Sequence, residues 1–213
     1  RPRTTRATPN IRQVLHEQGI EDPSSAMIKA VLINGARTMG TGQYSGAVEI
    51  PDYTPNGVNG FGHVNLRESI DPESGELFVM EGKVSNTGDS VTFSFQKYYS
   101  GKFDATLCWT DPTGSLAASK NLVNDLDLIV SCSEGTFYAG GATNKVDAVN
   151  NMEKMHAESL SSGDIEITVK GGNIMKGPQT FAIAVSGVDE FVPEPSFAFV
   201  SLLIALFLGR KMK

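Results

Sequence analysis

The feature that most constrains this chain is a series of short segments in which apolar and polar residues alternate. Val91, Phe93 and Phe95 alternate with threonine and serine, and further strand-like segments follow at 105–109, 126–130, 165–169 and 181–185. Alternation with a period of two buries one face of a strand and exposes the other. Short strands separated by turns rich in glycine, asparagine and serine are typical of a β-sandwich or jelly-roll barrel. The sequence therefore predicts a mainly β fold, with this domain at residues 81–188.

The first 80 residues carry helix signals instead. Ser24 and Ser25 offer a cap, Pro23 offers an early proline, and the apolar residues from Met27 to Ile33 recur at helical spacing. These signals predict a helix from about Ser24 to Ala36. Residues 40–62 are rich in glycine, proline, asparagine and tyrosine, which indicates a long irregular loop, and a final short helix or turn is expected from residue 63 to residue 70.

The C-terminal residues 189–213 form a third unit. An apolar run, FAFVSLLIALFL at 197–208, is preceded by Pro193-Glu194-Pro195 and followed by Arg210, Lys211 and Lys213. The run predicts a short hydrophobic helix, but it is shorter than the ~20 residues that cross a bilayer. The order of these parts resembles the PEP-CTERM sorting signal of exported bacterial proteins. This resemblance implies an exported protein, in the cell envelope or outside the cell, that meets a membrane or sorting machinery through residues 193–213.

Charge and composition exclude some partners and sites. The formal net charge is −6, which is the wrong sign for a protein that neutralises the phosphates of a nucleic acid, so no nucleic-acid partner is expected. Two cysteines and three histidines are too few for a zinc framework built on cysteine and histidine. The histidines are scattered and none adjoins a nucleophile motif, so structural roles are expected for them.

Oxygen-bearing side chains gather at the ends of two predicted strands. Asp111 follows the strand that ends near Trp109, and Asn124, Asp125 and Asp127 open the next one. Asp125 and Asp127 point to the same side of a strand, and carboxylate and amide oxygens suit Ca²⁺. The alternative is that these side chains cap turns by hydrogen-bonding the backbone. Both interpretations, a calcium site and a set of turn caps, stay open.

Cys108 and Cys132 each lie within or at the end of a predicted strand. If the two strands are neighbours, a disulfide is geometrically possible, and an exported protein would permit it. The alternative is two buried thiols that behave as small apolar side chains.

Six motifs in a fixed order resemble a known protease family. They occupy residues 23–36, 60–66, 107–112, 122–128, 149–153 and 177–183. The first two are similar to the end of the catalytic domain of subtilisin-like serine proteases, and the other four to the C-terminal β-barrel that some of these proteases carry. The resemblance covers about residues 7–188. It implies that residues 1–80 are the C-terminal remnant of an α/β catalytic domain.

From the same resemblance, this chain is expected to lack a catalytic triad. The family's nucleophile lies in Gly-Thr-Ser-Met-Ala-Thr-Pro, and Ala7-Thr8-Pro9 matches the end of that motif. By register Thr5 then falls at the nucleophile position, where its extra methyl group crowds the attacking oxygen. The family's catalytic aspartate and histidine have no counterparts here. No catalytic residue is therefore predicted.

The leading hypothesis is the C-terminal portion of an exported subtilisin-like endopeptidase, which acts on protein or peptide substrates only in the intact enzyme. The rival hypothesis is a non-catalytic, surface-anchored β-sandwich binding module or a pseudoprotease. Fold alone does not decide between them. Because residues 1–80 lack the parallel sheet that they cover in the family, their apolar helix face is expected to have no partner and to be locally disordered.

Overall fold

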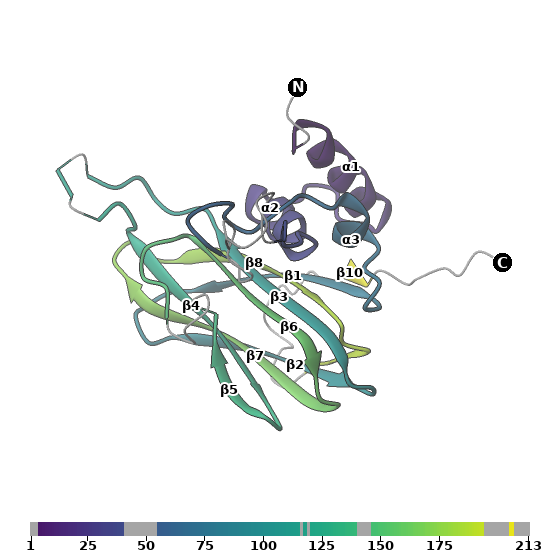
Figure 1. Cartoon of the computed structure of the whole chain (residues 1–213). Helices are drawn as coiled ribbons and strands as arrows, with labels where there is room; N and C mark the ends of the chain where they lie inside the picture. Colours follow the sequence, from purple (N-terminus) through teal and green to yellow (C-terminus); the bar gives the residue numbers. More distant parts are fainter. Residues whose placement is uncertain are drawn as a thin grey trace, which may run out of the picture.

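The computed structural model describes residues 4–40, 55–115, 117–118, 120–139, 146–193 and 205–206. These residues form two antiparallel sheets with helices on one side (Figure 1). The helix-side sheet has the strand order β10-β1-β8-β3-β6, and the outer sheet has the order β5-β4-β7-β2-β9. The helix-side strands are β1 (Leu77–Val84), β3 (Gly101–Trp109), β6 (Met152–Leu160), β8 (Gln179–Ser186) and β10 (Ala205–Leu206). The outer strands are β2 (Ser90–Lys97), β4 (Asn124–Cys132), β5 (Gly135–Tyr138), β7 (Gly163–Ile174) and β9 (Glu190–Val192).

The alternating segments of the sequence form the core between the sheets. Phe93 and Phe95 of β2 point inward from the outer sheet, where they meet aromatic side chains of the helix-side sheet edge to face. Ile165 and Ile167 of β7 are equally buried. The five predicted strands all exist, and each is longer than its alternating segment. The mainly β prediction is therefore confirmed, with two sheets enclosing one apolar core; we call this body the sandwich. The jelly-roll topology stays a prediction.

Helices cover the outer face of the helix-side sheet (Figure 1). The helices of the described residues are α1 (Thr4–Glu17), α2 (Ser25–Asn34) and α3 (Leu66–Ile70). The Ser24 side chain caps α2 by accepting a hydrogen bond of 3.0 Å from the backbone N–H of Met27. The helix predicted near 24–36 is confirmed, and the short helix or turn expected over 63–70 is a helix from Leu66. Together with α1 they form the helical layer.

The expectation of a helix face without a partner is wrong. Met27, Ala30 and Val31 of α2 are almost fully buried, in a cluster that also contains Leu77 and Ala184 of the helix-side sheet. The other side of α2 packs against α1 and α3. Residue periodicity could not show this, because α2 is apolar around most of its circumference and so does not reveal which surface it contacts.

The expected domain boundary at residue 80 falls inside strand β1. The sequence analysis missed β1 because Leu77, Phe78, Val79 and Met80 form a continuous apolar run rather than an alternating one. Such a run fits a strand that is buried on both faces. Here Phe78 faces the core between the sheets and Val79 faces the helical layer. The helical layer and the sandwich therefore share the same sheet.

Most of the predicted apolar tail lies outside the described residues. The part that is described, Ala205–Leu206, is strand β10 rather than a helix, and it pairs antiparallel with Phe78 and Val79 of β1. Within the described part of the chain, no helix is long and apolar enough to cross a membrane. Much of the expected loop at 40–62 also lies outside the described residues.

Candidate functional site

The side chain of Asp111, a predicted cation ligand, accepts hydrogen bonds from the backbone. One carboxylate oxygen accepts a 2.8 Å hydrogen bond from the backbone N–H of Val123, and the other accepts a 2.8 Å bond from the N–H of Asn124. The carboxylate thus closes the long connection between β3 and β4, which extends away from the sheets in Figure 1. Of the two interpretations left open by the sequence, a calcium ligand or a turn cap, these hydrogen bonds are those of a turn cap.

Asn124 is also fully engaged within the sandwich. Its amide nitrogen donates to the carbonyl of Lys176 and to the side-chain oxygen of Gln179, both at 2.8 Å. Its amide oxygen accepts from the backbone N–H groups of Met175 and Lys176, both at 2.9 Å. The Trp109 indole donates to the Asn124 carbonyl at 3.0 Å. A hydrogen-bond network therefore joins Trp109, Asn124 and Gln179, which lie far apart in the sequence and are all buried.

Asp125 and Asp127 are nearly buried, and they differ from Asp111 in having few partners. One Asp125 oxygen lies 3.9 Å from the Lys120 ammonium, and the other is buried without a hydrogen bond. Burial raises the pKa of Asp125, and Lys120 partly opposes this. Burial likewise raises the pKa of Asp127, against the effect of Lys170. Both carboxylates are therefore held at an electrostatic cost.

Glu153 of β6 is a buried acid to which the sequence analysis gave no separate role. Its carboxylate accepts hydrogen bonds from the backbone N–H groups of Leu128 on β4 and of Asp147. It thus links the helix-side sheet to the outer sheet. The pKa of Glu153 is raised to about 8, mainly by burial and also by the charges of Asp127 and Asp147, while its hydrogen bonds from Leu128 and Asp147 oppose the increase. The available signal was its place in the Asn150-Asn151-x-Glu153 cluster.

Two of the four predicted ligands already accept hydrogen bonds from the backbone. Asp111 and Asn124 have committed their oxygens to backbone N–H groups. Across the described residues, no group of three aspartate, glutamate, histidine or cysteine side chains is arranged to hold a metal ion. Calcium binding through Asp111, Asn124, Asp125 and Asp127 stays a prediction.

Cys108 and Cys132 are both free thiols. Cys108 lies on β3 in the helix-side sheet and Cys132 at the end of β4 in the outer sheet, so the condition for a disulfide, neighbouring strands, is not met. Cys108 is fully buried beneath the helical layer, and burial raises its pKa to about 12. The second alternative, buried thiols acting as apolar side chains, describes Cys108 well.

A buried polar contact joins α2 to the middle of the helix-side sheet. The Asn34 side chain, on the last turn of α2, donates to the Ser186 hydroxyl of β8 at 3.0 Å. It also accepts a 3.1 Å hydrogen bond from the Thr106 hydroxyl of β3. All three side chains are almost completely buried. Because an unpaired buried polar group is costly, this contact fixes the position of α2 along the strands.

Lys154 of β6 provides the second contact at the same end of α2. Its ammonium group donates to the carbonyls of Ile33, Asn34 and Ala36 at 3.1, 2.9 and 3.2 Å. These carbonyls end the helix, where the backbone dipoles favour a positive charge. Asp104 of β3, 3.1 Å away, is the counter-ion. Burial lowers the pKa of Lys154, and the charge of Asp104 opposes that decrease.

The other end of α2 is held by side chains near the end of β3. The Lys29 ammonium contacts the Asn151 side-chain oxygen at 3.3 Å, and the Asn151 amide donates to the Trp109 carbonyl at 3.0 Å. The hydroxyls of Ser25 and Thr110 are 3.3 Å apart. Polar contacts therefore hold α2 at both of its ends. We call these contacts, from Ser25 to Lys154, the α2 seam.

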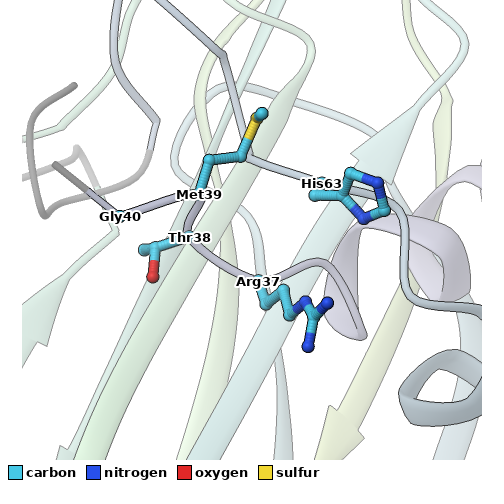
Figure 2. A pocket seen from close by; sticks show the side chains of 5 residues that line it. All are labelled: Arg37, Thr38, Met39, Gly40 and His63. Carbon is cyan, nitrogen blue, oxygen red and sulfur yellow. The ribbon is translucent and has the colours of Figure 1, made fainter. Parts of the chain in front are cut away.

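A depression of about 500 Å³ lies beside the end of α2 (Figure 2). Its lining residues are Arg37, Thr38, Met39, Gly40 and His63. Arg37 and His63 pair through their backbones, and Gly62 allows this close approach, since its φ is +98° and an added Cβ would lie 2.2 Å from the Arg37 carbonyl oxygen. The described lining residues include no carboxylate.

Thr5 lies in the first turn of α1, the helix that precedes Pro23 along the chain. The resemblance to subtilisin-like proteases placed the nucleophile position just before this helix, whereas Thr5 is its second residue. The structure thus defines a two-sheet β body that carries a helical layer, with buried polar contacts concentrated between the two.

Comparison with known proteins gives distant similarity to three curated proteins of Dictyostelium discoideum. They are the serine protease/ABC transporter B family proteins tagA, tagB and tagD, which are 26%, 25% and 28% identical to this chain. The matches cover 76%, 87% and 87% of this chain but 10%, 13% and 14% of those proteins. The chain therefore spans about a tenth to a seventh of the length of these relatives. It is distantly similar to a protease-related region.

No family model matches the sequence. Among solved structures, a protein from Sulfurospirillum deleyianum has a TM-score of 0.29 at 10% identity, over 51% of this chain and 96% of that one. A family GH115 4-O-methyl-alpha-glucuronidase has a TM-score of 0.28 at 12% identity, over 51% of this chain and 14% of that one. Scores this low carry no argument about fold or function.

Proposed function

We propose that this chain is the C-terminal portion of an exported subtilisin-like serine endopeptidase. The sandwich supports the end of the catalytic domain, and the chain does not itself cleave peptide bonds. The α2 seam carries the proposal. The motif that resembles the end of a protease catalytic domain, residues 23–36, is held by buried groups of a sandwich whose strands carry parts of the four motifs that resemble the C-terminal β-barrel.

The relatives support this proposal at a coarser level. Three proteins with serine protease in their names match most of this chain, including residues on both sides of the boundary expected at residue 80. The intact enzyme of the proposal uses serine as nucleophile, histidine as base and aspartate to orient the histidine, on protein or peptide substrates. None of these groups is assigned to a residue of this chain.

The role of the sandwich follows from its contacts. A helix as apolar as α2 needs cover on every side, and the helix-side sheet supplies one of these surfaces. Lys154 and Asn34 fix the register of α2 on the sheet. In an intact protease this would hold the segment that follows the nucleophile helix, so the sandwich contributes stability rather than chemistry.

An activity assay tests the non-catalytic part. The purified chain is incubated with casein and, separately, with a fluorophosphonate probe that labels active serine nucleophiles. We expect no hydrolysis and no labelling. Hydrolysis that a serine-directed inhibitor abolishes would overturn the proposal. A subtilisin-like protease assayed in the same buffer serves as the positive control.

The DNA upstream of the coding segment tests the protease part. The proposal expects a reading frame that encodes Gly-Thr-Ser-Met-Ala and the family's aspartate and histidine motifs. In the protein encoded by that joined frame, Lys154→Met is expected to shorten the half-life of activity on heating and to leave the initial kcat/KM unchanged. An upstream region without these motifs would favour a pseudoprotease or a free binding module.

The tail is part of the proposal as a sorting signal that acts with a membrane or with sorting machinery through residues 193–213. The support is the order of the proline-containing segment, the apolar run and the basic end in the sequence. Fractionation of cells that make the full chain, compared with a chain ending at Val192, tests it. Equal distribution of the two chains between membrane and soluble fractions would contradict it.

A further inference from the structure

One oxygen of the Asp104 carboxylate contacts both Lys154 and His156. Its Oδ1 atom lies 3.1 Å from the Lys154 ammonium and 2.8 Å from Nδ1 of His156. Lys154 reaches inward to the end of α2, whereas His156 lies two residues further along β6 and its side chain is 30% exposed. His156, which solvent can reach, and Lys154, which holds the end of α2, therefore contact the same carboxylate oxygen.

We propose that the hold of the sandwich on α2 depends on pH through His156, which acts on the Asp104 oxygen that Lys154 also contacts. Protonated His156 tightens the docking of the helical layer, and neutral His156 relaxes it. The proposal concerns this chain alone and does not rest on its being part of a protease.

The charges around His156 favour its protonated form. Asp104 faces it from β3, and Glu158 of β6 accepts from its Nε2 atom at 3.1 Å. The cations nearby are Lys154 on β6 and Lys102 on β3, whose ammonium is 3.8 Å from the other Asp104 oxygen. The hydrogen bond to Asp104 raises the pKa of His156, burial opposes this, and the charge of Lys154 also opposes it.

Within the described part of the chain, the groups that β8 and α2 place against Asp104 and Lys154 are uncharged. From β8 comes the Ser186 hydroxyl, and the last turn of α2 contributes backbone carbonyls and the Asn34 amide. When the helical layer is docked, Asp104 is almost completely buried, with 4% of its side chain exposed. Undocking exposes this carboxylate to water and weakens its interaction with His156.

The direction of the pH effect follows from the raised pKa. An unperturbed histidine has a pKa of about 6.5. Because docking raises the pKa of His156, its contribution is fully present below pH ~6.5 and is lost as pH rises through the docked-state value. Burial also lowers the pKa of Lys154, so the measurement is confined to pH 5.5 and pH 8, which limits the titration of the lysine itself.

Cys108 gives a direct measure of docking, since its thiol is fully buried beneath α2. In a Cys132→Ser background it is the single thiol of the chain. The rate at which a thiol reagent labels Cys108 then measures how often the helical layer opens. His156→Gln is compared with the parent at the same pH, which cancels the pH dependence of the reagent. His16→Gln, at an exposed position of α1, is the matched control.

We expect His156→Gln to be labelled several-fold faster than the parent at pH 5.5 and at nearly the same rate at pH 8. The control should match the parent at both values. Equal rates for His156→Gln and the parent at pH 5.5 would overturn the proposal. The same excess at both pH values would also overturn it, because it would show a packing role that is independent of charge.

Hydrogen exchange separates docking from global unfolding. Amides of β4 in the outer sheet report the whole fold, and amides of α2 report the helical layer. We expect His156→Gln to increase exchange in α2 at pH 5.5 and to leave Leu126–Val130 unchanged, after correction for intrinsic exchange rates. An equal increase in both regions would show that His156 stabilises the fold as a whole, and the proposal would fail.

Discussion

At the two ends of strand β3, backbone groups receive their hydrogen bonds from different kinds of side chain. Beyond Trp109, the neutral Asn124 side chain satisfies backbone groups of the sandwich, and every donor and acceptor of its amide is used. Near Asp104, the charged Lys154 side chain satisfies backbone groups of α2 and needs a buried counter-ion. The neutral network joins loops of one sandwich, whereas the charged cluster joins the sandwich to the helical layer.

The difference teaches where this molecule is sensitive to its surroundings. A neutral amide has the same hydrogen bonds at any moderate pH, so the Asn124 network acts as a constant term in stability. The ammonium, carboxylate and imidazole groups near Asp104 change their mutual energies with protonation and burial. The contact that holds the helical layer is therefore more sensitive to solution conditions than the Asn124 network is.

The largest effect is expected for Lys154→Met. It leaves Asp104 buried without its lysine partner and removes one hydrogen bond from each of three carbonyls at the end of α2, those of Ile33, Asn34 and Ala36. Removal of one member of a buried ion pair costs about 3–5 kcal/mol, and urea denaturation should show a decrease of that order in the free energy of unfolding. Lys120→Met, which affects a largely exposed lysine, is the control and should cost at most about 1 kcal/mol.

A double variant separates the charge from the packing. Adding Asp104→Asn to Lys154→Met removes the stranded buried carboxylate, so part of the lost stability should return. If the double variant is less stable than Lys154→Met, Asp104 has a stabilising role that the ion pair does not explain. That result would weaken the comparison between the two ends of β3.

The next effect is expected for Asn124→Ala. The substitution strands two backbone N–H groups, the Lys176 carbonyl and the Gln179 side chain inside the sandwich. An unsatisfied buried group costs about 1–3 kcal/mol, and partial relaxation should keep the total near ~3 kcal/mol in urea denaturation. The loss should be equal at pH 5.5 and pH 8. Asn121→Ala, at an exposed position of the same connection, is the control. A loss that changes with pH would break the distinction between the neutral and charged ends.

The thiols provide a third and smaller test. In the native chain at pH 8, we expect Ellman's reagent to label the partly exposed Cys132 promptly and Cys108 slowly, because Cys108 is buried and its pKa is raised to about 12. Lys154→Met should speed the labelling of Cys108, and Asn124→Ala should speed it less. A native chain with no reactive thiol before reduction would instead indicate a disulfide.

The sequence predicted the parts of this fold in which one residue pattern has one structural meaning. Val91, Phe93 and Phe95 alternate because one side of β2 faces the core. Ser24 predicts the start of α2, because few residues other than serine, threonine, asparagine and aspartate cap a helix well. The continuous apolar run at Leu77–Met80 was missed, because strands buried on both faces and buried helices look alike over four residues.

The candidate site could be predicted only where its chemistry is local. Asp111 was identified as a calcium ligand or a turn cap, and both interpretations follow from an aspartate after a strand. Lys154 and His156 were not identified, because their roles depend on the packing of α2 against β6 and on Asp104 from β3. No local pattern encodes a contact between residues more than 100 positions apart, as between Lys154 and Asn34. A lysine and a histidine two residues apart in a strand look like an exposed edge.

The smallest effect is expected for calcium. An ion that binds the native state at 100 times its dissociation constant stabilises it by about 2.7 kcal/mol, which would raise Tm by several degrees in a chain of this size. Because Asp111 and Asn124 are already committed to backbone N–H groups, we expect thermal unfolding in calcium and in a chelator to give the same Tm. A rise in calcium that Asp125→Asn abolishes and Asp89→Asn does not would show that the unpartnered Asp125 oxygen recruits an ion. In that case the neutral end of β3 would also respond to its surroundings, and pH would no longer be the only condition that distinguishes the two ends.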